Sequence, residues 1–394
     1  MKLWAIVIGL LLIGVLCAGC QPNSNDDDSS DDDITDDDID DDVDDDVDDD
    51  IDDDVDDDID DDIDDDVDDD VDDDVDDDLD DDADDDTTPD DDAVDDDTGA
   101  HIDVFAVGDG GLVLHYDGVS WSVTENVPCN FLLGVWGTSP TDVFVVCDGA
   151  RILHYDGSSW TAMYHPGYTS YLYGVWGTSH DDVFAVGLHG TILHYDGRSW
   201  TLMNSGFGED IISVWGTSPW NVFATSSYTV GEWVILSYNG VNWSAIRGED
   251  DEDIVWLIGI WGTSNSDIFA VGRSVYYSPL ILHYDGISWS AMEEGTFAWL
   301  YGVWGASPSD VFAVGENSRG KGIILHYDGS FWTVMEDGIT ESSLTGIWGS
   351  SSSDIYTVGG NGVILHFDGI SWTTMNSGTT SNLWSVWGTL RHGG

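Results

Sequence analysis

Positively charged residues are scarce in this sequence: eight Lys and Arg stand against 81 Asp and Glu, which gives a formal net charge of −73 over 394 residues. Seventeen Asp triplets lie between Asp26 and Asp97, a stretch with no Lys or Arg. From residue 98 onward, thirty acidic residues still face only seven basic ones. A chain this acidic repels phosphate backbones, which excludes nucleic acid as a partner. Cations, basic proteins and neutral polar ligands remain as candidates.

Long apolar runs are also scarce, and the clearest one opens the chain. Residues 3–16 are apolar but too few to span a membrane comfortably, and Lys2 precedes them. Small residues and then Cys20 follow, at a sharp change to polar sequence. Residues 1–20 resemble a bacterial lipoprotein signal, in which cleavage precedes the cysteine and a lipid is attached to it. One departure is Cys17, which stands where that family usually has Leu.

The resemblance implies a membrane partner through a lipid at Cys20. Because Asp does not follow Cys20 directly, it also implies a place in the bacterial cell envelope, at the outer membrane or cell surface. An ordinary cleaved signal peptide and an uncleaved anchor are the alternatives.

Residues 21–99 are of low complexity and mostly repeat three Asp and one apolar residue. Asp is a poor helix former, and like charges at i and i+4 repel each other. A strict period of four also drifts around a 3.6-residue helix, so no apolar face persists. The segment is therefore predicted to be a disordered, extended linker. No glycine marks a turn as in an EF-hand, so we expect diffuse Ca²⁺ association and no cofactor.

The remaining segment, 100–394, is predicted to be one domain because it repeats with a period of roughly 40 residues. Periods of this size indicate propeller blades or solenoid repeats. The Trp of a Trp-Gly pair recurs at Trp136, Trp176, Trp215, Trp261, Trp304, Trp348 and Trp387. A second Trp recurs at Trp121, Trp160, Trp200, Trp243, Trp289, Trp332 and Trp372.

Each copy divides into four short strand patterns joined by turn residues, as in residues 172–203. Four short antiparallel strands per repeat are typical of a propeller blade. The domain opens on a second strand at residues 102–108 and ends on a lone first strand at residues 383–389. The last strand can therefore complete the first blade, which predicts an all-β, seven-bladed β-propeller closed by its C-terminal strand. We expect it to be a monomer.

The string WGTSPxDVFAVGxxGxILHYDGxSW resembles repeats of secreted and lipid-anchored proteins of deltaproteobacteria. It is also distantly similar to BNR-like and photosystem II assembly factor-like propellers. The resemblance implies the fold, but it implies almost nothing about an activity. A sialidase arginine triad is not identifiable, and neither are a Ser/His/Asp order, an HExxH motif or a phosphate loop in the required context. The sequence favours a protein without catalytic activity but leaves the question open.

A histidine precedes most Tyr-Asp-Gly turns, and histidine clusters can bind metal. Equivalent positions on separate blades cannot converge on one ion, so we interpret these residues as structural and predict no metal site. They are His115, His154, His194, His283, His326 and His366, with Ser237 in the fourth copy.

Two sets of loops vary between copies, those after the second and fourth strands. Antiparallel alternation places both sets on one face, where function is expected. Aromatic platforms with carboxylates suit glycans or cationic peptides. The candidate binding residues are Tyr168, Tyr171, Trp233, Tyr276, Trp299, Glu209 and Asp210.

Three functions follow from this face. The first is a surface-displayed binding module for a glycan, a cationic peptide or an envelope protein. The second is a glycan hydrolase or lyase that uses carboxylates such as Glu209 and Asp210. The third is a passive structural lipoprotein. Of the aromatic residues near this face, Tyr173 and Tyr301 are expected to be buried.

Two cysteines of the repeat segment predict a disulfide bond. Cys147 ends a second strand and Cys129 lies just before a first strand, so the thiols fall near the same end of neighbouring strands. The estimated register leaves them about three residues out of step, which strains the distance limits of a disulfide.

Overall fold

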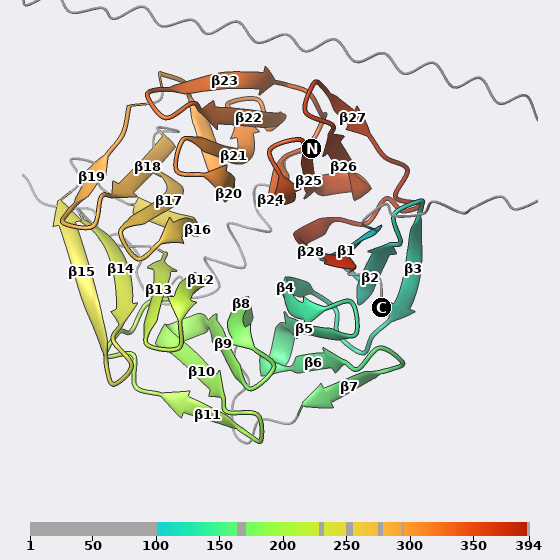
Figure 1. Ribbon diagram of the computed structural model, residues 1–394, viewed down its shortest axis with the longest axis horizontal. Coiled ribbons are helices and arrows are strands. Elements are labelled where there is room, and N and C mark those ends of the chain that lie inside the picture. Colours follow the sequence, from blue (N-terminus) through green and yellow to red (C-terminus); the bar gives the residue numbers. More distant parts are fainter. Residues whose placement is uncertain are drawn as a thin grey trace, which may run out of the picture. The chain divides into compact units, whose positions relative to one another are not determined.

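The computed structural model describes residues 101–163, 171–227, 232–249, 255–274, 279–293 and 295–391. These residues form seven four-stranded antiparallel sheets around a common axis, as Figure 1 shows. The predicted seven-bladed β-propeller is therefore confirmed. The predicted signal (1–20) and linker (21–99) lie outside the described residues.

The blades follow one another in chain order, and each contains four strands that run from the innermost outward. Blade one holds β28 (Leu383–Arg391), β1 (His101–Gly108), β2 (Leu112–Tyr116) and β3 (Trp121–Asn126). Blade two holds β4 (Leu132–Ser139), β5 (Asp142–Cys147), β6 (Ile152–Tyr155) and β7 (Trp160–Met163). Blade three holds β8 (Leu172–Ser179), β9 (Asp182–Gly187), β10 (Thr191–Tyr195) and β11 (Trp200–Met203). Blade four holds β12 (Ile211–Ser218), β13 (Asn221–Ser226), β14 (Glu232–Tyr238) and β15 (Trp243–Glu249).

Blade five holds β16 (Val255–Ser264), β17 (Asp267–Ser274), β18 (Pro279–Tyr284) and β19 (Trp289–Ala291). Blade six holds β20 (Ala298–Ser307), β21 (Asp310–Asn317), β22 (Gly322–Tyr327) and β23 (Trp332–Asp337). Blade seven holds β24 (Leu344–Ser351), β25 (Asp354–Gly359), β26 (Ile364–Phe367) and β27 (Trp372–Thr374). The helices among the described residues are the 3-10 turns η1 (Asp148–Ala150), η2 (Leu188–Gly190) and η3 (Gly360–Gly362), and none is long and apolar enough to cross a membrane.

The Asp-Gly turn between the third and fourth strands shows why the repeat folds locally as it does. In blade two, the Asp156 carboxylate accepts hydrogen bonds from the backbone N–H groups of Ser158 and Ser159. Gly157, between Asp156 and Ser158, has a φ of 88°, a left-handed conformation that favours glycine. An Asp followed by Gly therefore closes this hairpin at little steric cost.

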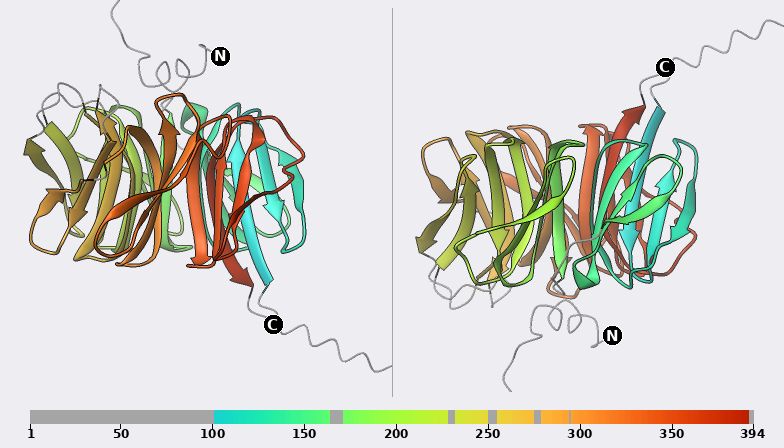
Figure 2. Two further views of the ribbon diagram at one scale, coloured as in Figure 1. Left: turned by 90° about the horizontal axis from the view of Figure 1, so that it is seen from above. Right: turned by 90° about the horizontal axis from the view of Figure 1, so that it is seen from below.

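The ring closes through the C-terminal strand, as the repeat count predicts. β28 pairs antiparallel with β1, from His101 opposite Arg391 to Gly108 opposite Leu383. β28 also contacts β24 and β4, the innermost strands of the two flanking blades. The two paired strands lie side by side and extend past the other strands at one face (Figure 2). Because β28 completes blade one, β1 is paired on both sides, with β28 and with β2, and is not left as an open edge.

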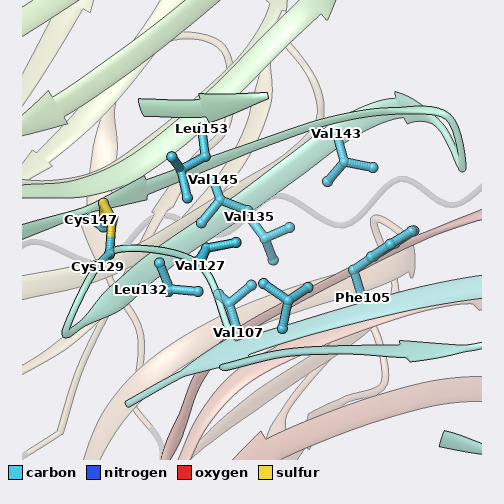
Figure 3. Close-up of a cluster of buried hydrophobic side chains, with 11 residues drawn as sticks. Phe105, Val107, Val127, Cys129, Leu132, Val135, Val143, Val145, Cys147 and Leu153 are labelled. Atoms are coloured by element: carbon cyan, nitrogen blue, oxygen red, sulfur yellow. A yellow bond between two sulfur atoms is a disulfide. The ribbon is translucent and has the colours of Figure 1, made fainter. Parts of the chain in front are cut away.

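The hydrophobic core is divided into seven clusters, each between two neighbouring blades. The cluster between blades one and two joins Phe105 and Val107 of β1 to Val135 of β4 and Val143 of β5 (Figure 3). Successive residues of each second strand alternate between the two flanking clusters, so both faces of a blade are apolar. This explains why the strands read as continuous apolar runs such as Asp-Val-Phe-Ala-Val-Gly.

The Trp-Gly pair of each innermost strand joins one blade to the next. A Cβ atom added to Gly177 of blade three would lie 2.8 Å from the indole of Trp136 of blade two. The same relation repeats around the ring, for example at Gly349 of blade seven, where the added atom would lie 2.6 Å from Trp304. Only glycine leaves room for the neighbouring indole, which explains why Trp and Gly recur together.

The structure contains a disulfide bond between Cys129 and Cys147 (Figure 3). Cys147 pairs with Leu132 in the ladder, so Cys129 does lie three residues beyond the register, as the sequence suggested. The chain before β4 folds back over the strand end, and the two Cα atoms lie 6.3 Å apart. This separation is within the range that a disulfide spans.

Deletion of residues 383–394 should leave blade one with three strands and expose its edge. Loss of the buried side chains of Leu383 and Val386 alone costs about 1.5–3 kcal/mol each. With the lost ladder, the melting temperature should fall by about 10 °C or more. Thermal unfolding followed by circular dichroism measures this, with deletion of residues 392–394 as the control. Equal melting temperatures for the two truncated proteins would contradict closure by β28.

Candidate functional site

The two faces of the propeller differ in the loops that they carry. Loops after the second strand bond to segments before the first strand: Leu188 N–H donates to Tyr171 O, and Gly360 N–H donates to Ser343 O. Turns after the first and third strands meet on the opposite side, where Gly157 packs against Thr141. We call the first side the variable face and the second the constant face. The predicted grouping of the two variable loop sets on one face is therefore confirmed.

Each innermost strand carries a β-bulge near its variable-face end, where its register with the second strand shifts by one residue. A bulge leaves one extra residue outside the ladder and redirects its side chain. The seven extra residues are Leu133, Tyr173, Ile212, Ile258, Tyr301, Thr345 and Trp384. The same geometry thus recurs around the axis with a different side chain in each blade.

Aromatic side chains gather at this end of the innermost strands, at one of two positions. One is the bulge residue itself, and the other is two residues before the bulge, on the far side of a buried residue. Five blades contribute to the set, and all members but Tyr301 are only half-buried. We call the set the axial aromatic group. Its members are Phe131, Tyr171, Tyr173, Trp256, Trp299, Tyr301 and Trp384.

Blades five and six add two ionisable side chains, Arg273 and Glu316, to the axial aromatic group. The Arg273 guanidinium lies 4.4 Å from the ring centroid of Trp256 and 3.5 Å from that of Trp299. Burial raises the pKa of Glu316, which pairs with Trp299 across the ladder, although a hydrogen bond with Tyr301 and the positive charge of Arg273 oppose the rise. An arginine held between two indoles fixes both rings in place.

The sequence missed Arg273 and Glu316 because each directly follows the glycine that ends the repeat motif of the second strand. β16 and β20 are two residues longer than most innermost strands, and this extension brings Trp256 opposite Arg273 and Trp299 opposite Glu316. The signal that could have found Arg273 is a basic residue at the end of a second strand, in a chain that has only eight Lys and Arg residues.

Carboxylates on the variable face hold loops in place. Asp109 accepts a hydrogen bond from Trp384 Nε1 at 2.6 Å, and Asp210 accepts one from the backbone N–H of His189 at 2.9 Å. Burial raises the pKa of the nearby Tyr173, and the negative charge of Asp210 adds to the rise. Glu209, the neighbour of Asp210, is exposed. The two candidate residues therefore differ: Asp210 is hydrogen-bonded just before β12, and Glu209 faces solvent.

The aromatic residues that the sequence predicted for the variable face do not all lie in the same surroundings. Tyr171 and Trp299 belong to the axial aromatic group, whereas Tyr168 and Tyr276 lie outside the described residues. Tyr301 is buried, as expected, and Tyr173 is half-buried rather than fully buried.

Trp233 requires a correction, because it is a core residue and not an exposed platform. It is 8% exposed in the cluster between blades four and five, with its indole over Gly248 and near Trp289. β14 begins at Glu232, earlier than the sequence pattern indicated, so Trp233 lies within the ladder on the same side as Ile235.

The repeated histidines lie on the constant face and pair within their own blades. In each of the six, Nε2 lies 2.6–2.8 Å from the Oδ1 atom of the Asp that begins the second strand. Each ring also packs on the aromatic residue of that strand, with centroids 4.5–4.6 Å apart. Blade four has Asn221 and Ser237 at these two positions, so both partners change together.

Blade two carries the most strongly perturbed of these pairs. Burial opposes the ionisation of Asp142, but hydrogen bonds, of which that from His154 is the largest, lower the pKa of this carboxyl to about 2. One of them comes from His180 of blade three. Sequence reasoning missed His180, although it stands where three sister turns have Pro.

The proposed lipidation residue, Cys20, lies outside the described residues.

No family model matches the sequence, and no curated protein matches it. Many solved structures share the fold. A structure of YCF48 from Cyanidioschyzon merolae is 13% identical, with a TM-score of 0.51, over 64% of this chain and 88% of that one. The computationally designed Ika8 protein is 10% identical, with a TM-score of 0.51, over 72% and 96%.

A third similar structure is a chain of a mitotic checkpoint complex, 11% identical with a TM-score of 0.54 over 71% of this chain and 83% of that one. At these identities the likeness shows the fold alone. The chain shares the β-propeller fold with these proteins.

Replacement of Trp233 by Ala should destabilise the protein by about 3–5 kcal/mol, because it leaves a cavity between blades four and five. Replacement of Phe297, which is 69% exposed on the variable face, should change stability by less than about 0.5 kcal/mol. Chemical denaturation of both variants measures the difference. If Trp233→Ala were as stable as Phe297→Ala, the core position of Trp233 would be wrong.

Proposed function

We propose that the protein is a non-catalytic binding module that takes a glycan or a protein on its variable face, at the axial aromatic group. The observation that carries this proposal is that the group gathers seven aromatic residues from five blades at one end of the innermost strands and leaves six of them partly exposed. Partly exposed aromatic rings stack on sugars and hold cationic side chains.

Charge and rigidity support the same proposal. The acidic excess of the domain favours neutral or cationic ligands over anionic ones. Trp256 and Trp299 are fixed by Arg273, and Trp384 is fixed by Asp109, so these rings need little ordering when a ligand binds. A protein partner is further supported by the similar chain that is part of a mitotic checkpoint complex.

The attachment point of the propeller fits display of this face. The described chain begins at His101, at the constant-face end of β1. The proposed binding surface is thus on the face opposite to His101, the first described residue. In this proposal the chain is a lipoprotein of the bacterial cell envelope, of the repeat type found in secreted propellers of deltaproteobacteria, with its lipid at Cys20.

Binding is tested with the full mature chain on arrays of envelope glycans and of basic peptides. The double variant Phe131→Ala and Tyr171→Ala should bind its best ligand at least tenfold more weakly, ~1.4 kcal/mol. These two side chains are chosen because neither holds Arg273 or Asp109.

The matched control is Phe331→Ala, which removes a ring that is 73% exposed on the constant face. It should bind as the unchanged protein does. Equal binding by the double variant would place the functional surface elsewhere. Absence of binding on either array would favour a passive structural protein, and release of products from a bound glycan would favour a hydrolase or lyase.

Lipidation is tested separately by replacing Cys20 with Ala. The variant should lose metabolic labelling by a fatty-acid analogue and leave the membrane fraction, because the thiol is the proposed attachment atom. Cys17→Ala is the control and should keep both properties. Retained labelling of the Cys20 variant would refute the anchor without bearing on the binding face.

A further inference from the structure

One turn of the constant face departs from the repeat in a way that brings a second histidine to a His–Asp pair. His180 lies between β8 and β9 of blade three, and its Nδ1 atom is 2.7 Å from Oδ1 of Asp142 in blade two. Nε2 of His154 lies 2.6 Å from the same oxygen. Two imidazoles from different blades therefore converge on one carboxylate.

We propose that Asp142, His154 and His180 form a binding site for one divalent transition-metal ion, with Zn²⁺ as the ion that fits best. The three ligand atoms, Oδ1, Nε2 and Nδ1, all lie within 4.8 Å of one another. Imidazole nitrogens with a carboxylate suit zinc and other first-row ions, whereas Ca²⁺ and Mg²⁺ prefer oxygen ligands alone.

The distances are close to those that coordination requires. Bonds of about 2.0–2.1 Å place neighbouring ligand atoms about 2.9 Å apart at right angles and about 3.3 Å apart in a tetrahedron. The nitrogen–oxygen separations of 2.6 and 2.7 Å are shorter than these by roughly 0.2–0.7 Å. A small rotation of the His180 side chain, which is 47% exposed, widens the separation of 2.7 Å, and the separation of 2.6 Å widens when the Asp142 carboxylate turns away from His154.

The surroundings of the site orient its ligands. The other oxygen of the carboxylate, Oδ2 of Asp142, accepts a hydrogen bond from the Thr138 hydroxyl. The His154 ring packs on Phe144, with centroids 4.6 Å apart, and is mostly buried. Outer contacts of this kind fix the direction of the ligating atoms. His180 forms the solvent side, so an ion can enter there and keep water in its remaining positions.

Binding of the ion needs no change in the oxidation state of any group. Without metal, each ring donates an N–H to Oδ1 of Asp142. When a neutral imidazole binds the ion, its proton moves to the other ring nitrogen, so each ring still carries one proton. Both ligating nitrogens then offer a lone pair, and the carboxylate is already ionised.

The other blades provide an internal comparison. Five further His–Asp pairs have the same geometry, and the position of His180 holds no histidine in the sister turns between first and second strands, where Pro140, Pro219, Asn265, Pro308 and Ser352 stand. A single site of this kind is therefore expected among the described residues. His180→Asn introduces the residue of blade five and is compatible with the turn.

The test is Zn²⁺ binding to the full chain by isothermal titration, in excess Mg²⁺ to occupy the Asp-rich linker. The unchanged protein should bind one Zn²⁺ more than His180→Asn, or bind it at least tenfold more tightly. Nitrogen-15 spectra should show Zn²⁺ shifting one ring nitrogen of His154 and one of His180. The control is His189→Asn, which removes an exposed histidine of the variable face near Asp210 and should keep the site.

Equal Zn²⁺ binding by the unchanged protein and His180→Asn, or ring nitrogens that do not respond to Zn²⁺, would overturn the proposal and leave a hydrogen-bonded link between blades. A second variant, His154→Asn, should lose the same ion. The result for His180→Asn decides the outcome, so the test stands even if the His154 variant fails to fold. The result is independent of ligand binding on the variable face.

Discussion

The contact on which the propeller depends is that of one blade's indole with the glycine of the next blade. Trp387 lies over Gly137, Trp136 over Gly177, and the series continues around the ring until Trp348 lies over Gly388. An indole buries a large area and requires that its partner carry no Cβ, so the spacing of neighbouring innermost strands is fixed at every step. Because the last contact joins blade seven to β28, the ring is complete only when the C-terminal strand is in blade one.

Much of the fold could be predicted from the sequence because each blade repeats the same local chemistry. The Trp-Gly pair, the apolar second strand and the Asp-Gly turn each reflect a contact within one blade or between adjacent blades. The open ends of the repeat also predicted the pairing of β28 with β1. Such features need only periodicity, and periodicity is visible in a single sequence.

The candidate site was less predictable because it depends on where strands begin and on which residues pair across them. Trp233 was expected in a loop, but β14 starts early enough to bury it. Trp256 was not singled out, yet the lengthening of β16 places it opposite Arg273. A shift of one or two residues at a strand end decides whether an aromatic ring is core or surface, and pattern reasoning does not resolve strand ends to that accuracy.

The departures from the repeat come in spatial sets, and this is what connects sequence variation to function. Arg273 and Glu316 depart together in adjacent blades, beside the indoles of the axial aromatic group. His180 is the one histidine among the described turns between first and second strands, and it meets an existing His–Asp pair of the neighbouring blade. A turn that only had to reverse the chain could keep Pro, as three sister turns do, so an imidazole there adds a contact that the fold does not require. In a molecule whose blades are held by one repeated contact, residues that break the repeat while meeting a partner across a blade boundary are where specific binding is to be sought.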